Sequence, residues 1–284
     1  MISIIVRKRF LIAWISLLPL LGWGQSLDQC YQHASSQLQL GNYENAVSAF
    51  HRVLYFDDGR YSSDALFQLA KSYQMIGEYE KARKFLDQSY AVTDNDSLRA
   101  EIIFEKSIAF TLSGNFYFAL MELMNIPDDA TTENRKRAHF HMGINYFQLE
   151  SFDASKKEFR KYLTFTDSSM IDSLDYLFDQ LRKLKRYRPN LAAGMSLVVP
   201  GSGQLYAGYP GEALNSFLLV GSFEVLFFVV AARYSLLDTY LTIVPWLQRY
   251  LYGGFKGAKR LTLERRAERK DEIYRELLQY ISRQ

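Results

Sequence analysis

The sequence predicts an all-α protein in which a solenoid of helix pairs is followed by a hydrophobic region long enough to enter a membrane. Three observations support this. A short segment of the first half recurs about every 36 residues, residues 213–232 are almost wholly apolar, and a glycine-rich stretch at 200–208 separates the two. A repeat of this period is typical of stacked helix pairs. An apolar stretch of about twenty residues matches the roughly 30 Å hydrocarbon core of a bilayer.

Composition and charge limit the classes of partner. The 284 residues suffice for two domains, and six prolines with 15% aromatic residues favour packed helices over a disordered linker. The net charge of +3 gives no global field for nucleic acid, so we expect no nucleic-acid partner. Basic clusters at 182–188 and 256–270 flank the hydrophobic region, as is typical near anionic lipid headgroups.

The sequence contains no pattern that indicates catalysis, so we expect neither an enzyme nor a cofactor. Its one cysteine, Cys30, excludes an intrachain disulfide and a cysteine metal site, and we interpret it as a buried, unreactive thiol. His139 and His141 stand two apart on an expected helix and therefore point to different sides, so no metal site is expected. A Gly-x-Ser-x-Gly nucleophile motif is missing.

The N-terminal residues 1–24 have the three parts of a secretory signal peptide. Arg7, Lys8 and Arg9 form a charged region, residues 10–21 form an apolar core, and Gly22-Trp23-Gly24 supplies small residues for a peptidase. The apolar core is too short to span a bilayer comfortably. We predict cleavage before Gln25; the alternative is an uncleaved anchor. Either way the following segment is expected to leave the cytoplasm.

Four copies of a six-residue pattern define the repeats at 26–166. The pattern combines a turn residue, an aromatic residue and a small residue, as in Gly41-Asn42-Tyr43-Glu44-Asn45-Ala46. The turn residues of the four copies are Gly41, Gly77, Gly114 and, in the weaker fourth copy, Glu150, spaced by 36, 37 and 36 residues. The small residues are Ala46, Ala82, Ala119 and, one place early, Ala154. Pro127 predicts a short second helix in the third copy.

These recurring positions resemble the tetratricopeptide repeat, a pair of helices joined by a Gly-polar-aromatic turn. The resemblance covers about half the chain and includes small residues on each first helix, at Ala34, Ala70, Ser107 and Gly143. It implies a superhelix with a concave groove that binds a protein or peptide partner.

The fifth position of each first helix is aromatic, and in this family that position faces the groove. These residues are Tyr31, Phe67, Phe104 and Phe140. Together with Ile108, Ile144 and Phe147 they imply an apolar surface for a partner. The alternative is that the rings only pack against the neighbouring repeat. The lysine and asparagine set with which some relatives hold a carboxylate is not present at these positions.

The remainder of the chain is expected to form three parts. Residues 167–188 read as a capping helix with a basic linker, because apolar residues recur at helical spacing between 169 and 186. Residues 189–255 read as a membrane domain with helices at about 213–232 and 236–255, although the second segment is weaker and an interfacial position is the alternative. Residues 256–284 read as a charged helical tail with a narrow apolar stripe, which docks on the repeats, on lipid or on a partner, or stays solvated.

The glycine-rich stretch carries the motif Pro-Gly-x-Gly-Gln-x-Tyr-x-Gly. Its residues are Pro200, Gly201, Gly203, Gln204, Tyr206 and Gly208, followed by Gly211. The motif resembles a small bacterial membrane domain of unknown function, with a distant likeness to the two-transmembrane-helix domain family. The resemblance implies a tight turn leading into a helical hairpin and carries no known reaction. The glycine spacing matches neither a phosphate-binding nor a dinucleotide-binding loop.

Glu224 is the only charged residue within 213–232. A carboxylate in mid-membrane is costly and usually faces protein or water. One interpretation is a contact with a proton or a substrate. The other is a protonated side chain hydrogen-bonded to Gln204, to Tyr206 or to a neighbouring subunit.

We therefore predict a tetratricopeptide-repeat scaffold of the bacterial cell envelope that is anchored to membrane lipid and binds an unidentified protein partner. Basic flanks normally stay in the cytoplasm, whereas the signal peptide exports the repeats. We take the signal peptide as the stronger indication and expect the repeats in the periplasm. The alternative function is an accessory component of an envelope transport or assembly complex that uses the hairpin and Glu224.

Overall fold

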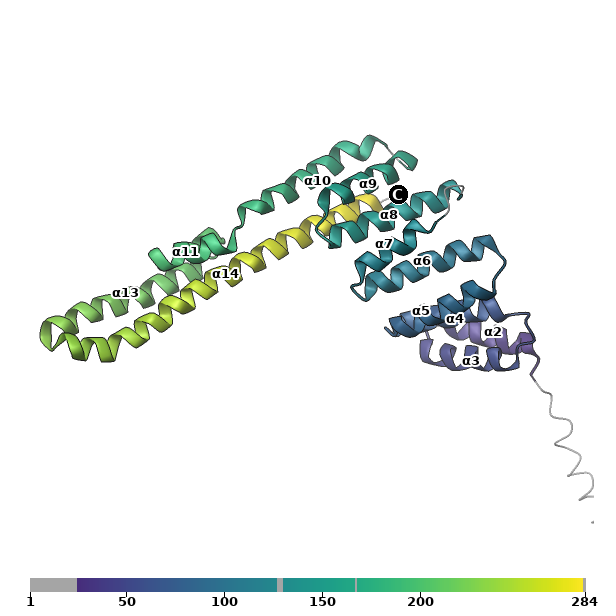
Figure 1. Ribbon diagram of the computed structural model, residues 1–284, viewed down its shortest axis with the longest axis horizontal. Helices are drawn as coiled ribbons and strands as arrows, with labels where there is room; N and C mark the ends of the chain where they lie inside the picture. Colours follow the sequence, from purple (N-terminus) through teal and green to yellow (C-terminus); the bar gives the residue numbers. More distant parts are fainter. Residues whose placement is uncertain (1–24, 127–129, 167, 283–284) are drawn as a thin grey trace, which may run out of the picture. The chain divides into compact units, whose positions relative to one another are not determined.

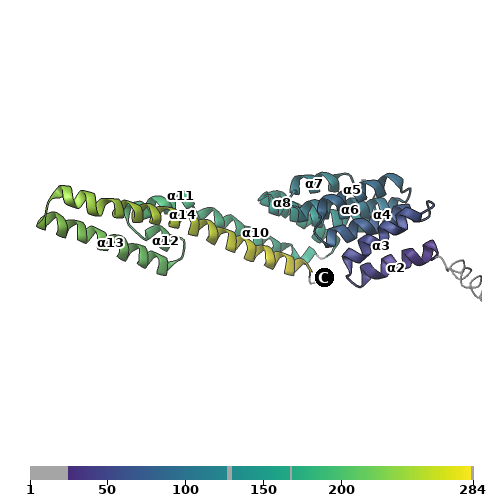
Figure 2. The ribbon, with the colours of Figure 1, turned by 90° about the horizontal axis from the view of Figure 1, so that it is seen from below.

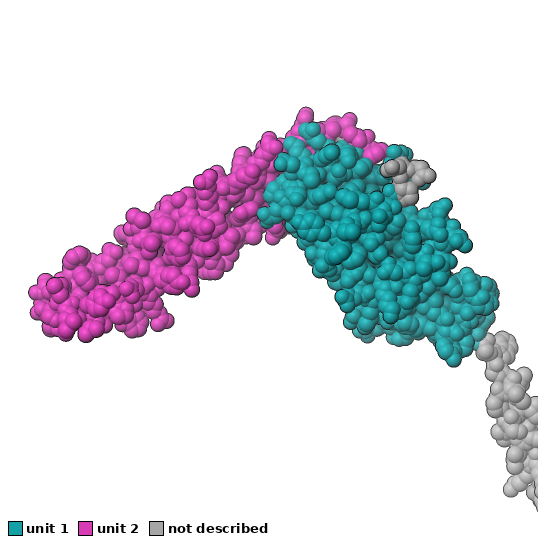
Figure 3. Space-filling view, in the orientation of Figure 1, with its two compact units in different colours: residues 1–162 teal, residues 163–284 magenta. Residues whose placement is uncertain are grey.

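The computed structural model describes residues 25–126, 130–166 and 168–282, and within these ranges every regular element is a helix. The chain divides into two compact units, residues 1–162 and 163–284, which Figure 3 shows in different colours. The predicted signal peptide, residues 1–24, lies outside the described residues, so its cleavage stays a prediction. Element labels follow Figure 1.

The first unit is a series of helix pairs (Figure 1), which confirms the all-α solenoid. Successive helices pack against one another along the chain, as the stacking of repeats requires. The pairs are α2 (Leu27–Gln39) with α3 (Tyr43–Phe56), α4 (Ser62–Met75) with α5 (Tyr79–Val92), α6 (Asp96–Leu112) with α7 (Phe116–Met124), and α8 (Thr132–Gln148) with α9 (Phe152–Phe165). The nine-residue α7 is short, as predicted.

Each pair turns at a residue with a left-handed backbone. The φ angles are +77° at Gly41, +83° at Gly77 and +76° at Gly114. Glycine adopts this conformation without steric cost because it has no Cβ. The fourth pair keeps the same turn without a glycine, since Glu150 has a φ of +56°. A non-glycine residue is disfavoured there, so the fourth turn is strained.

Small residues allow the helices of a pair to cross closely. Ala46, Ala82 and Ala119 are fully buried. In the fourth pair the buried residue is Ser155, one place after the alanine that the sequence analysis singled out. The Ser155 hydroxyl donates to the carbonyl of Gly143 at 2.8 Å. A Cβ at Gly143 would lie 2.9 Å from the ring of Phe159, so the crossing requires glycine.

The second unit contains the remaining helices. After a 3-10 turn at Ser168–Met170 come α10 (Ile171–Lys183), a second 3-10 turn at Leu184–Arg186, α11 (Pro189–Val198), α12 (Ser202–Tyr206), α13 (Pro210–Arg233) and α14 (Leu236–Ser282). Figure 2 shows α11, α12 and α13 beside α14, and each of these three helices contacts α14.

The segments expected as a membrane helix at 236–255 and a tail helix at 256–284 form one continuous helix, α14, of 47 residues. Pro245 lies inside it and removes only one backbone donor. Gly257 follows Phe255 but is itself helical, and no proline follows in the sequence, so the helix continues past this point. The apolar stripe of the tail is buried, at Ile273, Leu277 and Ile281, and this part of the unit packs on α10 of the same chain.

Candidate functional site: the repeat groove and the glycine motif

Three of the predicted groove residues lie in the core. The exposed fraction is 8% for Phe67, 0% for Phe104 and 1% for Phe147. Phe104 packs with Leu123 and Ala138. At these three positions the structure agrees with the alternative interpretation, in which the rings pack against the neighbouring repeat.

The other four predicted groove residues, Tyr31, Ile108, Phe140 and Ile144, are half-buried. The ring of Tyr31 stacks on that of Tyr61 with centroids 4.3 Å apart, and burial followed by the charge of Asp64 raises the pKa of Tyr31. Phe140 lies 5.3 Å from the ring of Tyr162. These four side chains are therefore only partly accessible to a ligand.

Polar side chains of neighbouring first helices form a ladder that the sequence analysis did not predict. The Arg137 guanidinium pairs with both carboxylate oxygens of Glu101, with Nη2 at 3.2 Å from Oε2, and lies 4.1 Å from the Phe104 ring centroid. Lys71 Nζ lies 3.6 Å from Glu105 Oε1, and Gln74 donates to the same carboxylate at 3.1 Å. A signal was available, since Glu101 and Arg137 occupy the same position of successive repeats.

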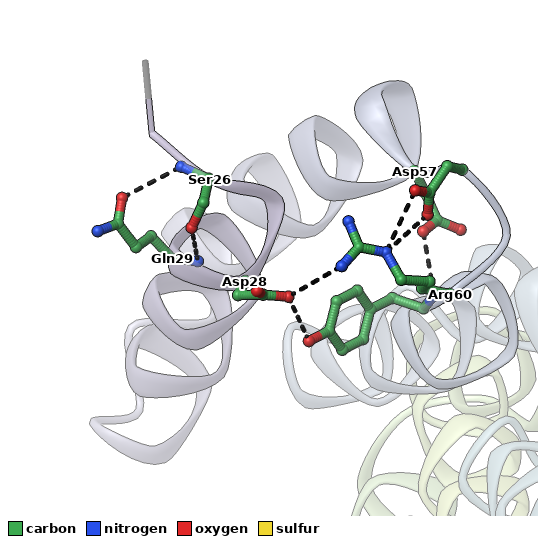
Figure 4. A network of polar contacts seen from close by, with 7 residues as sticks. Ser26, Asp28, Gln29, Asp57 and Arg60 are labelled. Carbon is green, nitrogen blue, oxygen red and sulfur yellow. Dashed lines mark hydrogen bonds and ion pairs between the residues drawn. The ribbon is translucent and has the colours of Figure 1, made fainter. Parts of the chain in front are cut away.

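The first pair is tied to the second by Asp28. Its carboxylate accepts a hydrogen bond from the Tyr61 hydroxyl at 2.8 Å and lies 3.6 Å from the guanidinium of Arg60 (Figure 4). The hydrogen bond with Asp28 raises the pKa of Tyr61. The same picture shows the Ser26–Gln29 capping box that begins α2. These contacts fix the N-terminal end of the solenoid.

Two titratable groups lie inside the repeat unit. Lys106 Nζ lies 2.7 Å from Asp87 and 2.8 Å from Glu122. Burial lowers the pKa of Lys106, but its hydrogen bonds to these carboxylates outweigh burial and the net shift is upward. Burial, with a smaller effect of the Arg137 charge, lowers the pKa of His141 to about 4, so this imidazole is neutral at pH 7.

The first two glycines of the motif allow backbones to touch. Gly201 has a φ of +87°, and a Cβ there would overlap the backbone carbonyl of Ala213 in α13. A Cβ at Gly203 would overlap the carbonyl of Ala192 in α11 and lie 2.6 Å from the Ser196 hydroxyl. The chain therefore reverses direction after Pro200, so that α12 packs back against α11.

Gln204 joins three helices. Its Oε1 accepts from the Ser196 hydroxyl of α11 at 2.6 Å, and its Nε2 donates to the carbonyl of Gly254 in α14 at 3.1 Å. The Gly203 amide in turn donates to the Ser196 hydroxyl at 3.0 Å. Gln204 is 3% exposed, and these bonds satisfy its amide.

The later motif residues hold the ends of the reversal. The Tyr206 hydroxyl donates to the carbonyl of Arg186 and accepts from the Arg188 amide at 3.2 Å. Gly208 has a φ of +88° and lies beside the guanidinium of Arg265. A Cβ at Gly211 would meet nothing within 4 Å, so no steric contact requires this glycine.

Glu224 is exposed on α13. The hydrogen bond to Gln204 or Tyr206 that one interpretation required is not formed; Gln204 donates to Gly254 and Tyr206 donates to Arg186. Within the described part of the chain it has no hydrogen-bond or ion-pair partner.

The second unit buries some polar side chains and exposes many large apolar ones. Polar side chains are buried at Ser196, Gln204, Thr239 and Thr262. Large apolar side chains are exposed on α11, α13 and the start of α14, at Val198, Phe217, Val225, Phe228, Leu236 and Leu241. Among the described helices, α13 is the one that is long and apolar enough to cross a membrane.

No metal-binding group of three or more His, Cys, Asp or Glu side chains lies among residues 25–126, 130–166 and 168–282. A search of the curated proteins found no significant match. Residues 29–59 (α2 and α3) and 64–89 (α4 and α5) each match the tetratricopeptide repeat. The first unit therefore contains tetratricopeptide repeats, a fold typical of protein–protein interaction scaffolds.

Proposed function

We propose that this protein is a membrane-anchored scaffold whose tetratricopeptide repeats bind a protein partner in the bacterial cell envelope. The exposed apolar side chains of α11, α13 and the start of α14 carry the proposal. Exposed apolar patches of this extent are unusual on a water-soluble protein and mark membrane or protein contact. The predicted signal peptide supports export of the repeats to the periplasm.

The anchor consists of α13 and the N-terminal part of α14, which enter the bilayer as a hairpin. The 24 residues of α13 extend over about 36 Å at about 1.5 Å per residue, which suffices for a crossing. Basic residues of α14 follow the apolar part, beginning with Lys256, Lys259 and Arg260. Their position suits contact with anionic lipid headgroups.

The partner site is the face of the first helices. Three half-buried apolar side chains lie on these helices, at Ile108, Phe140 and Ile144. The same helices carry charged side chains held by hydrogen bonds, at Glu101, Glu105 and Arg137. Apolar side chains beside charged ones suit an amphipathic peptide. The apolar contacts would supply affinity, and the charges would determine how the peptide is aligned along the helices.

Vesicle flotation of the full chain tests the anchor. The unmodified protein is expected to float with vesicles and to resist alkaline extraction. A variant with Leu218→Arg and Phe228→Arg on α13 is expected to lose this association, because each arginine is costly in hydrocarbon. Tyr117→Arg with Met121→Arg, on the exposed face of α7, is the matched control and floats like the unmodified protein. Recovery of the unmodified protein in the soluble fraction would contradict the anchor.

Cross-linking in intact cells tests the groove. Ile144→Asp is expected to abolish the cross-linked partner bands, because it places a charge on the apolar edge. Tyr117→Asp, a surface change on α7, is the control and keeps the bands. Identical bands from all three proteins would contradict a partner site on the first helices.

A further inference from the structure

Two opposite charges lie in the apolar surface of the second unit, and neither has an ionic partner. Glu224 on α13 and Arg249 on α14 are both exposed. Within the described part of the chain neither takes part in an ion pair, and the Arg249 guanidinium lies 6.0 Å from the Trp246 ring centroid. Charged groups at such positions normally pair with one another or with another protein.

The two charges lie at the same level of the hairpin. The ring of Phe223 stacks on that of Tyr250, with centroids 5.1 Å apart. Glu224 and Arg249 are the residues next to this pair on the two helices. Glu224 stands nine residues before Arg233, or roughly 14 Å along a helix at about 1.5 Å per residue, near the middle of a roughly 30 Å layer.

Helical spacing places Glu224 on the flank of the hairpin where α12 packs. Residues 213, 217 and 224 share one stripe of α13, because they are separated by four and seven positions. The carbonyl of Ala213, on this stripe, faces Gly201 at the start of α12.

Arg249 lies on the opposite flank. It shares a stripe of α14 with Gly253 and Arg260, at separations of four and seven positions. Gly253 and Arg260 line a cavity of about 290 Å³, together with Ser216 and Leu219 of α13 and Gln204 of α12. Ala213 and Phe217, on the stripe of Glu224, do not line this cavity.

We propose that the hairpin docks on a second copy of this chain, with Glu224 of one copy paired to Arg249 of the next. Identical copies enter the membrane in the same orientation, so charges at equal depth on opposite flanks meet when hairpins lie side by side. When two copies pair in this way, Arg249 of the first copy and Glu224 of the second remain unpaired. The contact is therefore heterologous and generates rings where the rotation closes. The proposal rests on the membrane placement of the hairpin.

A charge reversal in full-length protein tests this pairing. We would count subunits by single-molecule photobleaching after reconstitution at low density in phosphatidylethanolamine–phosphatidylglycerol vesicles. The unmodified chain is expected to form oligomers. Glu224→Arg and Arg249→Glu are each expected to weaken association at least tenfold, because each brings like charges together. The double variant restores opposite charges and is expected to restore assembly. Arg233→Glu, at the end of α13, is the control and assembles normally.

The outcomes separate the pairing from the anchor. Unmodified chains that float with vesicles but count as monomers would overturn the pairing alone. Single variants that assemble like the unmodified chain, or a double variant that stays dissociated, would overturn it as well. Unmodified chains that fail to float would overturn the anchor and, with it, the pairing. Flotation of each variant serves as the check on folding and insertion.

Discussion

Gln204 and Ser196 form a buried hydrogen bond of 2.6 Å that joins the two arms of the α11–α12 reversal. Because the other end of the Gln204 amide donates to the carbonyl of Gly254 in α14, one side chain fixes the reversal against the longest helix of the unit. Both groups are buried, so each is costly to leave unsatisfied. The glycine motif therefore acts through packing and hydrogen bonding, with no reaction assigned to it.

Gln204→Leu is expected to destabilise the second unit. The change leaves the Ser196 hydroxyl and the Gly254 carbonyl without this partner, and each lost partner costs about 1–3 kcal/mol. Thermal unfolding of the full chain in detergent, followed by circular dichroism, measures the effect. Gln248→Leu is the control, because Gln248 is exposed on α14 and its removal leaves no buried group unpaired. Equal unfolding midpoints for the two variants would contradict the structural role of Gln204.

Gly203→Ala and Gly211→Ala are expected to differ although both change a motif glycine. The first places a methyl group into the carbonyl of Ala192 and forces α11 and α12 apart, a form of overpacking that costs about 1–3 kcal/mol or more. The second meets nothing within 4 Å and lies in the first turn of α13, where alanine is tolerated. The difference in unfolding midpoint between the two variants is the measurement. Equal stability of the Gly203→Ala and Gly211→Ala proteins would contradict the close contact between Gly203 and the Ala192 carbonyl.

The repeat period and the small residues predicted the solenoid, because every pair must turn and cross in the same way. The turn glycines and the nine-residue α7 both follow from local sequence. The pairing of Ser155 with Gly143 was missed, because a serine hydroxyl that bonds across a helix crossing leaves no periodic signal. The continuation of α14 past Phe255 was also missed, because the charged composition of residues 256–284 was interpreted as a separate element.

The sequence left open whether the aromatic positions of the first helices face a groove or pack against the next repeat. Phe67 and Phe104 occupy the groove position of their helices, yet neighbouring pairs approach closely enough to bury the rings. Which ring is covered depends on the tilt between successive pairs, and sequence period does not determine that tilt.

Glu150→Gly is expected to stabilise the repeat unit by about 1 kcal/mol, because it removes the cost of a side chain in the left-handed region. The turn itself should not change, since the other three pairs make it with glycine. Gly77→Ala, which places a Cβ at a φ of +83° with open space around it, should destabilise by a similar amount. Chemical denaturation of both variants measures the two shifts. Opposite signs are required; a destabilised Glu150→Gly protein would show that its side chain contributes more than its backbone conformation costs.

His141 is expected to make the repeat unit less stable in acid. Burial lowers its pKa from 6.5 to about 4 in the folded chain, so the unfolded chain binds a proton more readily. The favourable contribution is complete above pH 6.5 and is lost as the pH falls toward 4; at about 1.4 kcal/mol per unit it amounts to roughly 3 kcal/mol at most. The free energy of unfolding, measured between pH 7 and pH 4, should fall less steeply for His141→Gln than for the unmodified chain. His33→Gln, at an exposed position of α2, is the control and keeps the steeper profile. Parallel profiles for His141→Gln and the unmodified chain would show that another group governs the acid sensitivity.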